Sequence, residues 1–431
     1  MDGCKSVIFD EMKRILPILI FLVSACSHSR EACDAYSADS GSGSVSDRNK
    51  PERYRSVPSP DFSDSVAVPQ AQNLAMEEVA VQTIMVVSEK KSAEFKQESV
   101  SISTSNQQLI SATYVELANL NSSISAQRTQ RNPAEQDQVR MNKDVQLLGQ
   151  IAPESFEYNL YKYVSGNYDV SRISFLEKAA ELQPSNKEVV LQLASYFVCM
   201  DDDIGSLNYL DKWSRGLSKD QKDLTYSIDL LNSIDENGIL VVHGINDTYS
   251  ALLQQLKYKF RTDIRIVSLE LLQSQQYRKS LISKGIKLPD SALIDRRYLE
   301  ALCQLNKEKN PFLSMTIPKE YLTGMSSRLF AVGLTFEYSE QVDFDNFYRN
   351  ELLWNSKLSK DLLKELQQKE NRTSTENELV ANYLPMLLQM RQVYVQKNEL
   401  DRTKEIDFVL DQIGNATGKM DLIEKIKQGQ Q

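Results

Sequence analysis

The chain has 431 residues, 41% hydrophobic and 25% charged, which is typical of a globular protein with room for two or three domains. Its formal net charge of -9 argues against nucleic acid as a partner, because phosphates require a positive protein surface. Only two histidines occur, His28 and His243, and the five cysteines form no CxxC pair. We therefore expect no disulfide framework, histidine metal site, Ser-His-Asp triad or cofactor, and no enzymatic activity.

Residues 13–26 combine a Lys-Arg pair, a short apolar run and a cysteine. The apolar run, 15–23, is too short for a spanning helix, which needs about 20 residues, but it has the length of a secretory signal core. The closing Val-Ser-Ala-Cys resembles the lipobox of bacterial lipoproteins. The resemblance implies cleavage before Cys26 and a lipid on its thiol.

Two neighbouring features refine this prediction. The first eleven residues are acidic, whereas signal starts are basic, so we expect translation to begin at Met12. Ser27, not aspartate, follows the lipid cysteine, which favours the outer membrane over retention at the inner membrane. Residues 1–26 are thus predicted to be a lipoprotein signal peptide, and the side of the outer membrane stays open.

Residues 27–132 are predicted to be a tether. Gly-Ser and Pro-Ser runs at 40–44 and 58–60 offer too little apolar area to offset the entropy of ordering the chain. From residue 66 the pattern is mixed, and helices over 74–87 and 109–124 are the elements it favours.

Residues 133–235 are predicted to be helical, beginning with helices over 144–151 and 156–164. Tyr161-Lys-Tyr-Val-Ser-Gly-Asn-Tyr168, followed by Lys178-Ala-Ala-Glu-Leu-Gln-Pro184, resembles one tetratricopeptide repeat. In this interpretation Gly166 permits the turn between two antiparallel helices, and Tyr161 and Tyr163 either fill the repeat core or line a peptide-binding groove.

A weaker helical pair follows. Apolar residues recur at helical spacing over 190–197 and 207–213, and Asp201-Asp-Asp203 lies between them. The triplet lacks the spacing of a calcium loop, so we expect it to be a turn that caps the next helix.

Residues 236–340 are predicted to be a small Rossmann-like α/β module with a parallel sheet. The nearly all-apolar run 238–243 is typical of a buried parallel strand, and further strands are expected over 263–268, 311–316 and 329–338. Helices are expected between them, over 249–260, 271–284 and 319–327.

Several segments of this module share a pattern with one known family. They are Ile239-Leu-Val-Val-His-Gly-Ile-Asn-Asp-Thr-Tyr249, Arg261-Thr-Asp-Ile-Arg-Ile-Val-Ser-Leu-Glu-Leu-Leu272, Ala331-Val-Gly-Leu-Thr-Phe-Glu-Tyr338 and Asn382-Tyr-Leu-Pro385. Together they resemble the soluble C-terminal module of the DUF2723 family, large membrane proteins related to protein O-mannosyltransferases. The family's glycosyl-transfer residues lie in a multi-span membrane domain that has no counterpart in this sequence. Ile245 also replaces an aspartate of the family's turn.

Residues 341–431 are predicted to form a C-terminal helical hairpin, with helices over 377–394 and 400–410 and a short last helix. Pro385 is expected in a first turn or at a kink, and Gly414 and Gly418 are expected to end helices. The predicted fold class is therefore mixed: repeat-like helical hairpins flank a small parallel-sheet α/β module, and a disordered tether precedes them.

One candidate ligand site lies at the sheet edge. Asn246, Asp247 and Thr248 follow the first predicted strand, and His243 is adjacent. Ligands bind at the carboxyl edge of open parallel sheets, so these residues suggest a pocket for a small polar or glycan ligand. Asn, Asp and Thr are also preferred helix caps, and capping is the interpretation that we favour for them.

These patterns lead to three hypotheses of function. The first is a lipid-anchored, non-catalytic scaffold of the bacterial cell envelope that binds other envelope proteins. The second is a binding module for a small polar or glycan ligand at the sheet edge. The third, a glycosyl-transfer enzyme, rests on family resemblance alone and offers no catalytic residues.

Overall fold

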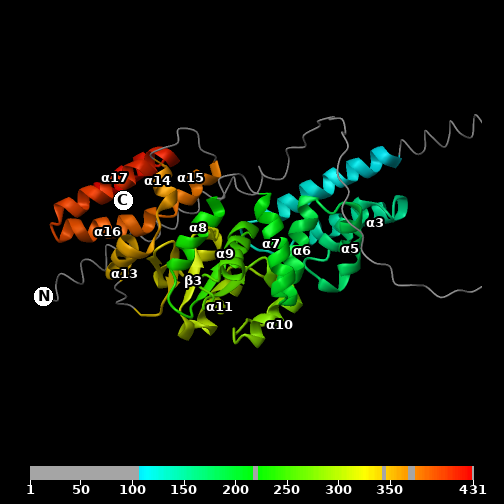
Figure 1. Ribbon diagram of the computed structural model, residues 1–431, viewed down its shortest axis with the longest axis horizontal. Helices are drawn as coiled ribbons and strands as arrows, with labels where there is room; N and C mark the ends of the chain where they lie inside the picture. Colours follow the sequence, from blue (N-terminus) through cyan, green and yellow to red (C-terminus); the bar gives the residue numbers. More distant parts are fainter. Residues whose placement is uncertain (1–105, 217–221, 342–345, 367–373, 430–431) are drawn as a thin grey trace, which may run out of the picture. The chain divides into compact units, whose positions relative to one another are not determined.

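The computed structural model describes residues 106–216, 222–341, 346–366 and 374–429. The signal segment, Cys26 and the tether up to residue 105 lie outside these ranges. Within 110–431, which form one compact unit, a small sheet lies between the helices that precede it in the chain and those that follow it (Figure 1).

The helix predicted over 109–124, inside the proposed tether, is confirmed. Residues 106–125 are already helical, and Leu117, Leu120 and Ile124 are buried together with residues of α3 and α4. Residues 110–132 therefore belong to the folded unit and not to the tether, because this apolar stripe supplies the area that a stable helix must bury. The helices that follow are α3 (Glu135–Ile151), α4 (Phe156–Val164), η2 (Val170–Arg172), α5 (Ile173–Leu182), α6 (Lys187–Met200), α7 (Asp203–Arg215) and α8 (Lys222–Asn232).

The repeat-like pair α4 and α5 forms as expected, but its turn works differently. The left-handed backbone lies at Asn167 and Tyr168, not at Gly166. Gly166 is needed for a close approach instead, since an added Cβ would lie 2.7 Å from Cδ of Arg172. The second pair, α6 and α7, is also confirmed, and Asp202 accepts from the first amides of α7 as the capping interpretation predicts.

The sheet has five strands in the order β2-β1-β3-β5-β4, and it is mixed rather than parallel. β1 is parallel to both β2 and β3, whereas β5 is antiparallel to β3 and β4. The expected single strand over 329–338 is a hairpin, because Gly333 (φ +55°) turns the chain back. The strands are β1 (Ile239–Val242), β2 (Arg265–Ser268), β3 (Pro311–Ser314), β4 (Leu329–Val332) and β5 (Thr335–Tyr338).

Both faces of the sheet are covered, as expected for a three-layer module. Ile239 and Val241 of β1 belong to one apolar cluster with α10, α11 and α12, whereas Leu240 and Val242 belong to another with α8 and α9. This burial on both sides explains the unbroken apolar run of β1. The helices and helical turns between the strands are α9 (Ile245–Tyr258), η3 (Leu271–Gln273), α10 (Gln275–Ser283), α11 (Arg296–Leu305), η4 (Lys307–Lys309), α12 (Lys319–Leu322) and η5 (Ser326–Arg328).

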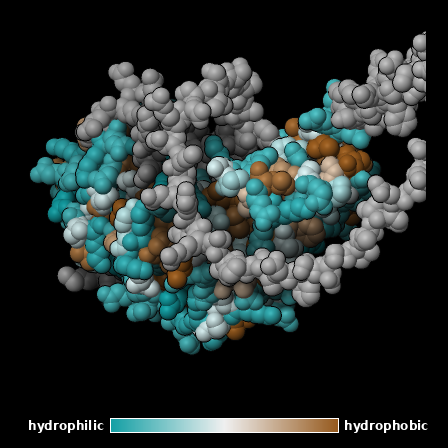
Figure 2. All heavy atoms as spheres, turned by 45° about the vertical axis from the view of Figure 1, so that its right-hand side comes forward, coloured by the Kyte–Doolittle hydropathy of each residue, from teal (hydrophilic) through white to brown (hydrophobic). Residues whose placement is uncertain are grey.

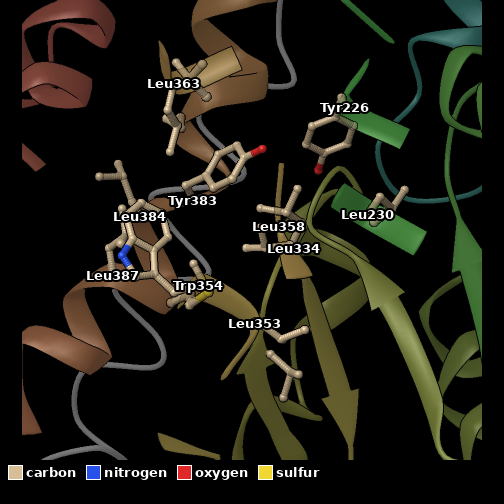
Figure 3. Close-up of a cluster of buried hydrophobic side chains, with 14 of the residues drawn as sticks. Tyr226, Leu230, Leu334, Leu353, Trp354, Leu358, Leu363, Tyr383, Leu384 and Leu387 are labelled. Carbon is tan, nitrogen blue, oxygen red and sulfur yellow. The ribbon is translucent and has the colours of Figure 1, made fainter. Parts of the chain in front are cut away.

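The C-terminal helices share their core with the sheet. Trp354, Tyr383 and Leu384 lie in one buried cluster with Leu230 of α8 and Leu334 of the β4–β5 turn (Figure 3). The elements are α13 (Phe347–Leu352), a π-helical turn η6 (Leu353–Lys357), α14 (Asp361–Glu365), α15 (Ser374–Ala381), α16 (Leu384–Gln396), α17 (Leu400–Thr417) and α18 (Met420–Lys427). This cluster extends from Tyr226 to Ile423, so the C-terminal helices share one core with a face of the sheet, where the sequence suggested a separate module and hairpin.

The helix boundaries in this region agree only partly with the prediction. The predicted helix over 377–394 is divided into α15 and α16, and Pro385 lies in the first turn of α16, where a missing amide hydrogen costs no bond. Gly414 lies inside α17, packed against Met420 and Ile423, so it does not end a helix. Gly418 does end α17, with φ of +67°.

Candidate binding sites

The carboxyl ends of three neighbouring parallel strands bring the predicted sheet-edge residues together. The register pairs Val242 with Ser268, and Val241 with Leu313. His243, Glu270 and Thr316 therefore follow their strands at the same edge of the sheet.

The capping interpretation of this edge is wrong. The N-cap of α9 is Gly244, with φ of +85°, and no side chain caps the helix. Asp247, which is 3% exposed, instead accepts hydrogen bonds from the hydroxyls of Ser314 and Thr316. Thr248 donates to the Gly244 carbonyl, or to Oγ of Ser268 at 3.0 Å. Asp247 and Thr248 thus join α9 to the neighbouring strands, while Asn246 is half-buried in the first turn of the helix.

A buried ion pair lies beside them. Nη1 of Arg131 is 3.1 Å from Oε1 of Glu270, and it also donates to the Ser125 carbonyl. Nε2 of His243 lies 3.7 Å from the same Glu270 oxygen. Arg131 comes from the segment predicted as tether, so no local pattern indicated that it would lie at this edge.

Little space remains for a ligand here. A cavity of about 50 Å³ lies between the sheet edge and the helices, lined by Arg131, Glu270, Gln273, Asn121 and Gln192 among others. Such a volume holds one or two water molecules, whereas ligand pockets are typically about 300–1,000 Å³. The geometry therefore favours a structural role for His243, Asp247 and Thr248, and ligand binding by them stays a prediction.

The tyrosines proposed for a peptide groove are core residues. Tyr161 and Tyr163 are 3% and 1% exposed and belong to the apolar cluster of the first helices. Burial raises the pKa of Tyr163 well above its ordinary value. Neither side chain can contact a partner at the surface.

A groove does exist on the neighbouring surface, between α3 and α4. Its volume is about 530 Å³. Gly149 permits the close packing beside it, since an added Cβ would lie 2.7 Å from the Tyr158 ring. The lining residues are Asn142, Val145, Gln146, Gly149, Gln150, Tyr158, Lys162, Ser165 and Arg172.

Two cations and no carboxylate line this groove, although the chain is acidic as a whole. Arg172 is held in place: it donates to the Lys162 carbonyl and to Oγ of Ser165, and its Nε lies 3.5 Å from Asp169. The Lys162 ammonium has no ion-pair partner among the described residues. The sequence contained one signal for this groove, the amides at 142, 146 and 150, but the helix was expected to start only at 144.

The two described cysteines are unsuited to nucleophilic chemistry. Cys199 and Cys303 are buried, as expected from their apolar neighbours. Burial raises the pKa of Cys199 to about 12, so its thiol stays protonated at neutral pH. Within the described ranges, no group of His, Cys, Asp or Glu side chains is arranged to hold a metal ion.

Residues 223–423 therefore define a three-layer α/β domain with a C-terminal helical extension, preceded by a bundle of helical hairpins. The family model for TMEM260-associated domain 2 matches this range, 223–423. The match agrees with the shared core of the sheet and the C-terminal helices, and it identifies a distinct domain family. It neither names the DUF2723 family nor bears on a lipid anchor, so both stay predictions. Searches of curated proteins and of solved structures found no significant match to the chain.

Proposed function

We propose that this protein is a non-catalytic scaffold of the bacterial cell envelope, and that it binds a partner protein in the groove between α3 and α4. The groove itself is the observation that supports this proposal. It is about ten times larger than the cavity at the sheet edge, and it is lined by polar and cationic side chains that a partner can contact.

The proposed anchor is a lipid on Cys26, at the outer membrane. The support is the sequence at 13–26, with its basic pair, short apolar run and lipobox-like ending. Among the described helices, none is both long and apolar enough to cross a bilayer. Incorporation of a clickable palmitate analogue into the wild-type chain, and its loss in Cys26→Ala, is the expected result. Equal labelling of both chains would refute the anchor.

The binding of a small polar or glycan ligand at the sheet edge is the alternative. Its support is the convergence of three parallel strand ends, and its weakness is that Asp247, Thr248 and Glu270 already bind other residues of the chain. Glycosyl transfer rests only on the resemblance to the DUF2723 family.

A site-specific crosslink separates these possibilities. A photo-reactive amino acid replaces Gln146 in the groove, or Lys404 on α17 as the matched control, since both positions are exposed. The tagged full-length chain is irradiated in native membranes. We expect one envelope protein to crosslink from position 146 and not from 404, and to be recovered in lower yield with Cys26→Ala. Equal crosslinking from both positions, or none from 146, would count against a scaffold that uses this groove.

A further inference from the structure

We infer that the groove between α3 and α4 recognises an extended, acidic segment of the partner protein. The inference rests on the proposed scaffold function and adds the chemistry of the partner to it. Two independent features carry it: the spacing of the amides on α3 and the charge of the side chains that face them.

The amides form a row along one face of α3. Asn142, Gln146 and Gln150 are each four residues apart, so they recur about every 6 Å along the helix axis. An extended peptide repeats every two residues, at about 6.6 Å. Successive amides can therefore meet the backbone N–H and C=O groups of every second residue of an extended segment. A helical peptide offers no such groups, because its backbone hydrogen bonds are internal.

The amides are available for this purpose. All three side chains are exposed, and those of Gln146 and Gln150 make no hydrogen bond to the described residues. Oδ1 of Asn142 accepts from Gln138 at 3.0 Å, which orients this amide. A primary amide both donates and accepts, so it can bind a peptide unit through either group.

Charge decides which side chains the segment carries. Lys162 of α4 lines the same groove without an ion-pair partner in the described chain, while Asp169 already compensates part of the Arg172 charge. An aspartate or glutamate facing Lys162 would therefore gain a charge-assisted hydrogen bond. A lysine or arginine there would be repelled by both cations.

An apolar partner fits the same surface poorly. The only aliphatic side chain in the lining is that of Val145, which is 3% exposed, and Tyr158 is half-buried. Figure 2 shows hydrophilic residues over much of the visible surface, with groups of hydrophobic residues between them, one of them toward the upper right of the view. Hydrogen bonds and charge, rather than buried apolar area, must therefore supply the specificity.

Binding of defined peptides to the purified full-length chain tests the inference. The probe is a fluorescent eight-residue peptide that alternates serine and glutamate, and the matched probe alternates serine and lysine. The variants are Lys162→Glu, Lys162→Arg, the pair Gln146→Ala and Gln150→Ala, and Lys404→Glu as a control of equal charge change away from the groove. Circular dichroism serves as the control that each variant is folded.

We expect the glutamate peptide to bind and the lysine peptide not to bind. Lys162→Glu should weaken binding by about tenfold or more, the value of one charge-assisted hydrogen bond, and Lys162→Arg should retain it. The double alanine variant should weaken it severalfold, and Lys404→Glu should leave it unchanged. Equal binding of both peptides, or equal affinity of Lys162→Glu and wild type, would overturn the inference. Competition by free glutamate at the affinity of the peptide would also overturn it, because it would reveal a small-anion site.

These outcomes are separate from those of the scaffold proposal. A partner that crosslinks from position 146 but contacts the groove through a neutral or basic segment keeps the scaffold and refutes the acidic specificity. The absence of any crosslink from that position refutes the scaffold's use of the groove.

Discussion

Replacing Arg131 with methionine should destabilise the folded unit strongly. The arginine side chain is 2% exposed and that of its partner Glu270 is 11% exposed. Methionine keeps most of the volume but leaves the Glu270 carboxylate in a buried position without its closest cation. Breaking a buried ion pair from one side typically costs about 3–5 kcal/mol, and the hydrogen bond to the Ser125 carbonyl is lost as well. We therefore expect a loss of about 3–5 kcal/mol in the free energy of unfolding.

The assay is urea denaturation followed by tryptophan fluorescence and circular dichroism, with coincident transitions required before a free energy is extracted. Arg131→Met is compared with Glu270→Gln and with the double variant. Because the glutamine side chain is neutral, the double variant leaves no buried carboxylate unpaired, and it should be more stable than Arg131→Met alone by about 1 kcal/mol or more. If the free energy of unfolding of Arg131→Met lies within about 0.5 kcal/mol of the wild-type value, the ion pair does not stabilise the fold as argued. Strict additivity in the double variant would refute the coupling.

Three further substitutions test other parts of the fold. Gly333→Ala should destabilise the β4–β5 turn by more than about 1 kcal/mol, since φ is +55° and the added Cβ would lie 2.1 Å from Oγ of Ser233; an unchanged urea midpoint would contradict this close approach. Two hydrogen bonds from Arg261 hold the pKa of Asp263 at about 2, so wild type should exceed Asp263→Asn in stability by about 1–2 kcal/mol at pH 7. Because the pKa of Asp263 is lower in the folded than in the unfolded chain, its carboxylate stabilises the fold fully above about pH 4, and this stabilisation is lost as the pH falls to about 2. The stability difference between wild type and Asp263→Asn should therefore shrink between these pH values. A difference that does not change with pH would exclude this origin. Trp354→Ala removes a large side chain from the buried cluster in Figure 3, so it should lower the free energy of unfolding by about 3–5 kcal/mol. A loss of less than about 1 kcal/mol would show that Trp354 is not packed as described.

Local pattern predicted the elements whose signal lies in neighbouring residues. The apolar run at 238–243 contains β1, and the amphipathic run at 156–164 became α4 with the expected bounds. The first is determined by its unbroken apolar run, and the second by helical periodicity and by Ser155, whose side chain accepts from the Tyr158 amide. The β4–β5 hairpin was missed for a related reason, because a Gly-Leu turn inside an apolar run gives no break in hydrophobicity, and only the positive φ of Gly333 shows it.

Long-range contacts could not be predicted in this way. Arg131 lies in a Ser- and Gln-rich stretch that looks unstructured, yet its backbone N–H donates to the carbonyl of Ile294, far along the sequence. Asp229 likewise accepts from the amides of Ser359 and Lys360 and from the hydroxyl of Tyr383. No local periodicity encodes such pairings, because a single polar residue is compatible with either a solvated loop or a buried network.

The same long-range contacts explain why the usual ligand position of this fold is closed. Open parallel sheets bind ligands beyond the carboxyl ends of their strands. Here Asn121 and Ser125 of the first helix, Arg131, and Gln192 of α6 line the space beside Glu270, which leaves about 50 Å³. The partner-binding surface that we propose therefore lies elsewhere in the molecule. The groove between α3 and α4 belongs to the same group of helices that covers the sheet edge, so the segment that closes this edge also builds the surface of the groove.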